Sequence, residues 1–298
     1  RLSGYAAVAF LFACSADRGP PIALPDAMVD ARVVDATGPD FGPPPDPDPG
    51  PRLTALVAPP IDRGAQVGLY GRNPADGQSV GLAGDVPIFA AELARLLPVI
   101  IYADALASGG VTPDERLTVG PEHLRGRGLR AEDLGADLPV ADLARRALLD
   151  NDRTAEAVLV DRLGGVSAIE EAMARWAIEG LRGYLEPCER DRAFAMGLDP
   201  RFAEVECRAL GAFLHAADGR GLTPTPFAEA PVYSVDVQRI AALALNDHPR
   251  GASSPRAWGQ LLSRLAHRTL HGGVPDTWVL SLLDDGLGVG GGDGVPPS

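Results

Sequence analysis

The hydrophobic pattern is densest in residues 86–110, which predict a buried helix. A helix that is apolar nearly all round belongs in a protein core. Gly109 and Gly110 end the stretch as helix terminators do, and Pro98 predicts a kink or a break because it lacks a backbone donor. Charged residues within the stretch argue against a membrane span. The apolar positions cover more than one face: Phe89, Leu93, Leu96, Leu97, Ile100, Ile101 and Leu106.

Two short strand patterns precede this helix, at residues 66–70 and 78–82. The intervening Asn-Pro-Ala-Asp-Gly at 73–77 is typical turn sequence, so the pair predicts a β-hairpin. Further short strands are expected at residues 117–119, 267–270 and 276–283.

Amphipathic patterns predict five more helices after the buried one. In the third of these, Ser167 as N-cap and Glu170 three residues later fit a capping box. A hairpin, then helices, then strands is an α/β (α+β) layout, in which an antiparallel sheet joins both ends of the domain. The helices are expected at residues 140–150, 154–163, 167–178, 235–246 and 257–266.

The chain begins with an apolar run, residues 2–13, after Arg1. It is too short to span a membrane and is typical of an export signal. Its end, Leu-Phe-Ala-Cys at Cys14, resembles a bacterial lipobox, in which that cysteine carries the lipid. The alternative is a plain secretory signal with an incidental cysteine.

Low-complexity sequence flanks the globular region on both sides. Residues rich in Pro, Asp and Gly follow Cys14, and they bury too little apolar surface to offset the entropy of ordering. We therefore expect a lipoprotein-type signal segment at 1–14, a disordered linker at 15–52, one domain at 53–285 and a disordered tail at 286–298.

Charge and residue usage narrow the chemistry. The net charge of −13 argues against nucleic-acid binding, which needs clustered cations. All 27 basic residues are arginine, so a lysine base or Schiff base is excluded, because arginine stays protonated.

The cysteines allow a disulfide, and the histidines are the residues that could ligate a metal. Cys188 and Cys207 form either a disulfide or two buried thiols, and both readings stay open. The histidines lack paired ligand spacing on a helix, so we expect no metal and no cofactor. They are His123, His215, His248, His267 and His271.

Taken in order, these segments resemble the class A β-lactamase and penicillin-binding serine hydrolase family over about residues 66–283. The resemblance rests on the strand-turn-strand that leads into AGDVPIFAAELARLLPVIIYADALASGGVTPDERLTV, and on ALLDNDRTAEAVLVDRLGG. It implies a β-lactamase/DD-peptidase-like fold, with an antiparallel sheet flanked by an all-helical subdomain. It also implies Ser-x-x-Lys, Ser-Asp-Asn and Lys-Thr-Gly motifs and a water-activating glutamate.

This sequence departs from the family pattern at its first two motifs. The segment from Glu92 to Arg95 stands at the Ser-x-x-Lys position, with a carboxylate for the hydroxyl and a permanent cation for the amine. Asn151, Asp152 and Arg153 stand where Ser-Asp-Asn is expected, and only the aspartate is kept.

The remaining positions match in part. Arg268 and Thr269, followed by Leu270, stand at Lys-Thr-Gly, where an arginine still suits a carboxylate. Glu186 stands at the water-activating glutamate, but Arg190 occupies the place of the asparagine expected four residues later. Glu92 and Arg95 are expected to form an ion pair on one helix face.

The favoured hypothesis is an exported, periplasmic or outer-membrane lipoprotein that no longer hydrolyses β-lactams. It would bind a peptidoglycan-like, β-lactam-like or anionic peptide ligand with help from Arg153 and Arg268, as a monomer that meets the membrane only through its lipid. One alternative is an active serine hydrolase, a β-lactamase or DD-peptidase, with Ser79 or Ser108 as nucleophile. Another is a gene product without a stable fold.

Overall fold

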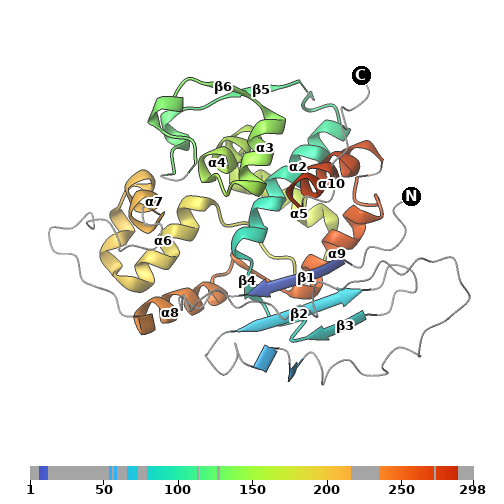
Figure 1. Cartoon of the computed structure of the whole chain (residues 1–298), viewed down its shortest axis with the longest axis vertical. Coiled ribbons are helices and arrows are strands. Elements are labelled where there is room, and N and C mark those ends of the chain that lie inside the picture. The colour runs from blue at the N-terminus through green and yellow to red at the C-terminus, as the bar shows by residue number, and fades with distance from the viewer. Residues whose placement is uncertain are drawn as a thin grey trace, which may run out of the picture.

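The computed structural model describes residues 7–12, 54–55, 57–58, 66–72, 79–112, 114–125, 128–215, 235–271 and 273–287. The expected linker at 15–52 and most of the expected tail therefore lie outside the described residues. Figure 1 shows a small sheet on one side of the molecule and a larger group of helices on the other.

The main sheet has three antiparallel strands in the order β1-β2-β3. The predicted hairpin is confirmed as β2 (Val67–Arg72) and β3 (Ser79–Leu82), while its turn lies outside the described residues. The other neighbour of β2 is β1 (Ala7–Phe12), which falls within the apolar run expected to be an export signal.

Two pairs of short strands tie the connecting segments together. The strand β4 (Ile88–Phe89) pairs with β7 (Ala252–Ser253), so the entry to the central helix lies beside a segment far along the chain. The strand expected near residue 117 is confirmed as β5 (Arg116–Thr118), paired with β6 (Asp137–Pro139).

The central buried helix is confirmed as α2 (Leu96–Ala107), in which every residue from Leu96 to Ala103 is buried. A 3-10 helix at Ala91–Arg95 precedes it. Pro98, predicted to kink the helix or mark a break, lies in the first turn of α2, just after the change from the 3-10 helix, where its missing N–H has no partner within the helix.

Three helices follow on the helical side (Figure 1): α3 (Val140–Leu149), α4 (Arg153–Arg162) and α5 (Gly165–Trp176), of which α4 and α5 pack on α2 and α3 packs on α4. All three were predicted. The capping box at Ser167 is wrong, because α5 begins two residues earlier. Its N-cap is Gly164, whose φ of 93° is a left-handed conformation that glycine adopts without strain.

A second group of helices lies apart from this bundle: α6 (Pro187–Leu198), α7 (Cys207–His215) and α8 (Val235–Ala244). Cys188 and Cys207 form a disulfide, which confirms that alternative and joins α6 to α7. The helix predicted at residues 235–246 from its amphipathic pattern is confirmed as α8.

The chain returns to the sheet through α9 (Pro255–Ala266), which packs on β1 and β2. Gly259 allows this close approach, because a Cβ there would lie 2.2 Å from the Tyr70 ring. The strands predicted at 267–270 and 276–283 are wrong. The first is a turn, and the second lies within α10 (Val274–Leu287), which packs on α2.

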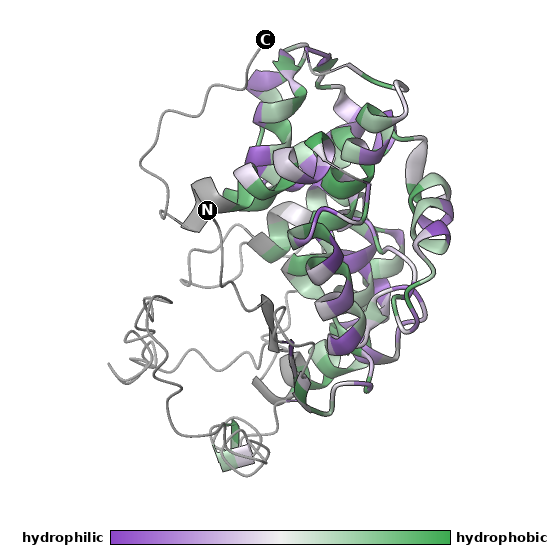
Figure 2. Cartoon of the chain, turned by 90° about the vertical axis from the view of Figure 1, so that its right-hand side faces the viewer, coloured by the Kyte–Doolittle hydropathy of each residue, from purple (hydrophilic) through white to green (hydrophobic). Residues whose placement is uncertain are grey.

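One large core joins α2 to α3, α4, α5, α9 and α10. In Figure 2, hydrophobic and hydrophilic residues alternate along the helices, as expected where each helix buries one face. The architecture is mixed α/β with a helical subdomain, which confirms the predicted fold class. Among the described helices, none combines the length and the apolar character that crossing a bilayer requires.

Candidate functional site

A buried ion pair lies next to the segment that leads into α2. Arg190 of α6 donates from Nη2 to Oε2 of Glu156 at 2.5 Å and from Nη1 to the carbonyl oxygen of Ala91 at 3.1 Å. The Tyr184 hydroxyl donates to the other carboxylate oxygen of Glu156. Arg190 and Glu156 are 5% and 1% exposed, so this network holds α4, α6 and the start of the central helix together.

Burial and charge act against each other in this network. Burial acts most strongly and lowers the pKa of Arg190, but Glu156, Tyr184 and Asp191 together outweigh it and the net pKa is raised. Burial, followed by the Glu156 charge, raises the pKa of Tyr184 well above its ordinary value. The pair is therefore a permanent cation on a carboxylate, with a neutral phenol beside it.

Arg95 and Arg153 lie in the same region, and both are buried. Arg95 donates from Nη1 to the carbonyl oxygen of Ala147 at 3.1 Å, which ties the 3-10 helix to the end of α3. Arg153 forms an ion pair with Asp191 of α6. The expected ion pair of Arg95 with Glu92 stays a prediction, because the side chain of Glu92 is outside the part that the structure describes.

Asp152 caps α4 and binds the segment at Leu129, which lies before α3. Its carboxylate accepts hydrogen bonds from the backbone N–H groups of Ala155 at 2.9 Å and Leu129 at 3.0 Å. Gly128 has a φ of +90°, and a Cβ there would lie 1.9 Å from Oδ1 of Asp152. Burial raises the pKa of Asp152 against these hydrogen bonds. Its observed role is that of an N-cap.

Glu186 precedes α6, and its side chain is 24% exposed. Its closest cation is Arg125, whose Nη2 lies 3.6 Å from Oε1. Burial raises the pKa of Glu186, the attraction of Arg125 opposes this, and the charges of Glu189 and Glu156 add to it.

The structure thus brings most of the predicted site residues to one region, but Arg268 and Thr269 lie elsewhere. Arg268 and Thr269 lie exposed in the turn after α9. The other end of α9 follows β7, which pairs with β4 just before Ala91. The twelve residues of α9 span about 18 Å. Arg268 is therefore one helix length away from the network at the start of α2.

Sequence reasoning missed Glu156, Tyr184 and Asp191 as members of this region. Glu156 offered a signal, since apolar residues of α4 flank it on both sides and its burial requires a partner. The identity of that partner gave no signal, because Arg190 lies on another helix 34 residues later.

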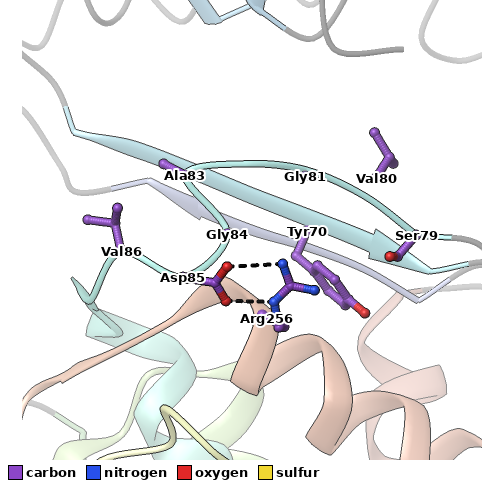
Figure 3. Close-up of a pocket in the computed structure, with 9 residues that line it drawn as sticks. All are labelled: Tyr70, Ser79, Val80, Gly81, Ala83, Gly84, Asp85, Val86 and Arg256. Atoms are coloured by element: carbon purple, nitrogen blue, oxygen red, sulfur yellow. Dashed lines mark hydrogen bonds and ion pairs between the residues drawn. The ribbon is translucent and has the colours of Figure 1, made fainter. Parts of the chain in front are cut away.

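A separate hollow of about 450 Å³ lies at the sheet, away from this network. Figure 3 shows the carboxylate of Asp85 facing the guanidinium of Arg256, with the Tyr70 ring beside it. Asp85 accepts two hydrogen bonds from Arg256, at 2.6 and 3.0 Å, and Arg256 lies 5.1 Å from the centre of the Tyr70 ring. The hollow is lined by Tyr70, Ser79, Val80, Gly81, Ala83, Gly84, Asp85, Val86 and Arg256.

The two alternative nucleophiles lie in different places. Ser79 lines the hollow at the sheet. Ser108 follows α2 at its far end, is exposed, and donates to the carbonyl oxygen of Ala105 at 3.1 Å. Within the described ranges, no group of three or more His, Cys, Asp and Glu side chains is arranged to hold a metal ion.

Comparison with known proteins decides the family. The model of the family described as "Beta-lactamase enzyme family" matches residues 51–285, most of the chain. This protein belongs to the beta-lactamase enzyme family. No curated protein matches this family member.

Two solved beta-lactamase structures share the fold of this beta-lactamase family member at low sequence identity. The last common ancestor of Gram-negative bacteria beta-lactamase class A (GNCA4) has a TM-score of 0.52 at 18% identity, over 78% of this chain and 70% of that one. A beta lactamase from Xanthomonas campestris has a TM-score of 0.52 at 12% identity, over 78% and 69%. The structure titled L2 complexed with relebactam has a TM-score of 0.49 at 16% identity, and this chain covers 62% of its length.

Proposed function

We propose that this member of the beta-lactamase family is a non-hydrolytic, extracytoplasmic protein that holds an anionic peptide or cell-wall-type ligand. The observation that carries the proposal is the grip of Arg190 on Ala91 and Glu156 at the start of α2. Acyl transfer requires a nucleophile beside a group that accepts its proton. Arg95 and Arg190 contribute guanidinium ions at this position, which do not accept protons, and the buried carboxylate of Glu156 is already held by Arg190 and Tyr184.

The extracytoplasmic location is supported by two findings, the Cys188–Cys207 disulfide and the family itself. Disulfides persist in oxidising compartments such as the periplasm. Lipidation of Cys14 stays a prediction from the sequence.

The ligand class follows from the charges near the partly exposed edge of the network. Arg153 pairs with Asp191, and Arg268 lies at the far end of α9, so neither supports a ligand site at the start of α2. Arg125 is the better candidate, because its guanidinium stands beside the half-buried Glu186. When Glu186 is protonated, its negative charge is gone and an anionic ligand takes its place beside the guanidinium.

Hydrolysis of a chromogenic cephalosporin tests the proposal directly. The purified full chain is expected to show no turnover above buffer, because residues 86–107 contain no serine and burial keeps the one hydroxyl described in the network, that of Tyr184, neutral. Turnover that is lost in the Glu186→Gln variant and kept in the matched Glu189→Gln variant would contradict the proposal, because it would make Glu186 a working base.

The alternative is an active serine hydrolase that uses Ser79 or Ser108. The hollow beside Ser79 is the observation in its favour. Turnover that disappears in Ser79→Ala, or in Ser108→Ala, would support this alternative.

A further inference from the structure

The two sulfurs of the Cys188–Cys207 disulfide lie in different surroundings. Cys188 is only 2% exposed, whereas Cys207 is partly exposed at the beginning of α7. The rate of thiol–disulfide exchange depends on which sulfur a thiol from solution can reach. Attack from solution is therefore expected at Sγ of Cys207.

Arg192 of α6 brings a positive charge to Cys207. Its Nη2 lies 3.8 Å from Sγ of Cys207 and donates to the carbonyl oxygen of Val205 at 3.4 Å. Its Nη1 pairs with Glu189 at 2.7 Å, but the side chain of Glu189 is 51% exposed, so water screens that pair. A neighbouring arginine favours the thiolate form of a cysteine.

The helix ends alone do not distinguish the two sulfurs. Cys188 lies in the first turn of α6 and Cys207 in the first turn of α7. The free backbone N–H groups of a first turn favour a thiolate at either position. The contact with Arg192 adds a further stabilisation at Cys207.

A small apolar core holds α6 and α7 side by side independently of the disulfide (Figure 1). It joins Ala195 of α6 to Leu210 and Phe213 of α7 through Phe202, which lies in the 3-10 helix Pro200–Glu204. The rings of Phe202 and Phe213 stack with their centres 5.0 Å apart. The two cysteines are therefore expected to stay near each other after reduction, so that the disulfide can form again.

We propose that Cys207 is a thiol-exchange site and that its reaction partner is an external dithiol. One thiolate of the dithiol attacks Sγ of Cys207, the S–S bond breaks, and Cys188 leaves as a thiolate that takes up a proton. The second thiolate of the dithiol then attacks the reagent sulfur that is bonded to Cys207. Cys207 leaves as a thiolate beside Arg192, and the dithiol departs oxidised to a disulfide. This inference is independent of the proposed loss of hydrolysis.

Brief exposure of the full chain to glutathione, a monothiol, identifies the sulfur that is attacked. A Cys14→Ser background removes the third cysteine, acid stops the reaction, and peptide mapping by mass spectrometry locates the mixed disulfide. The mixed disulfide is expected on Cys207 about tenfold more often than on Cys188. Equal labelling of the two cysteines, preferred labelling of Cys188, or no labelling would overturn the inference.

Alkylation by neutral iodoacetamide tests the role of Arg192. In a Cys14→Ser/Cys188→Ser chain Cys207 is the only cysteine, and its alkylation rate at pH 7 follows the amount of thiolate. Arg192→Met is expected to slow the alkylation by about threefold to tenfold, because the neighbouring cation is lost. Glu189→Gln is expected to speed it, because the guanidinium then has no carboxylate partner on Nη1.

The matched control is Arg116→Met, which removes the same charge from an exposed pair that involves neither cysteine. Its alkylation rate is expected to equal that of the parent, and equal rates in Arg192→Met and Arg116→Met would overturn the role of Arg192. If the parent without Cys188 shows no thermal transition, the same variants are compared by the rate at which dithiothreitol reduces the intact disulfide. Arg192→Met is again expected to react more slowly than Arg116→Met, and equal rates there would also overturn the inference.

Discussion

Single side chains decide whether the region at the start of α2 has a catalytic or a structural role. Arg190 holds a buried carboxylate and a backbone carbonyl at once, so its two Nη atoms hold three elements together. A buried ion pair adds little net stability compared with well-packed apolar residues, but removing one partner leaves an uncompensated charge. The network is therefore far more sensitive to single substitutions than to paired ones.

Arg190→Met is expected to lower the free energy of unfolding by about 3–5 kcal/mol, because Glu156 stays buried without its cation. Denaturant unfolding followed by circular dichroism measures this. Arg116→Met is the control, since Arg116 and Asp137 are both more than half exposed and such pairs contribute about 0–1 kcal/mol.

The double variant Glu156→Leu/Arg190→Met is expected to be more stable than Arg190→Met alone, because neither charge remains. Equal losses in the Arg190→Met and Arg116→Met variants would contradict the structural role of the buried pair.

The pH dependence of stability reports on Glu186. Burial raises its folded-state pKa above the ordinary 4.5. Between the unfolded and folded values the folded state binds more protons, so the contribution of Glu186 to stability falls as pH rises through that range. The free energy of unfolding of Glu186→Gln, relative to the unmodified protein, is therefore expected to rise from acid to neutral pH. A constant difference would contradict the raised pKa.

Sequence reasoning located most residues of the candidate region but not the residues that pair with them. Asp152 and Glu186 were found because they stand in a recognisable order along the chain. The Arg190–Glu156 pair was not found, since ion pairs between helices depend on packing that local patterns do not encode. Ser167 shows the opposite error, because a good capping sequence lost to a left-handed glycine three residues earlier.

At the scale of elements, the disulfide fixes the helix that carries Arg190. Cys188 lies in the first turn of α6 and Cys207 begins α7, with their Cα atoms 5.3 Å apart. This crosslink keeps the start of α6, with Glu186 just before it, against the helical side of the region. The two helices and the network are expected to lose order together.

Cys188→Ser/Cys207→Ser is expected to lower the melting temperature, since closing a loop of 19 residues stabilises by about 3 kcal/mol. Scanning calorimetry of the unmodified and variant chains measures the loss. Cys14→Ser is the matched control and is expected to leave the melting temperature unchanged. An unchanged melting temperature in the double variant would show that the crosslink does not constrain the fold.

Helices with long amphipathic patterns were predictable, and short apolar runs were not. Residues 276–283 were expected to be a strand, but they belong to α10, where buried Val279 and Leu282 are three residues apart and face α2. A run of this length fits either structure, and only the contact with α2 decides between them. The same ambiguity applies to residues 7–12, which fit both an export signal and a strand.

At the scale of the whole molecule, the beta-lactamase fold is kept, and we propose that the groups gathered at the start of its central helix do not carry out acyl transfer. The fold was predictable because hairpin, buried helix and later helices follow a recognisable order. The position of Arg268 was not predictable, because it depends on α9 being followed by a turn and not by a strand.

The central claim is the loss of a nucleophile, and incubation of the full chain with excess fluorescent penicillin, followed by intact-mass spectrometry, tests it most directly. The account predicts a single species at the unmodified mass, both before and after long incubation. A mass increase equal to one penicillin, mapped to a serine and abolished by replacing that serine with alanine, would contradict it.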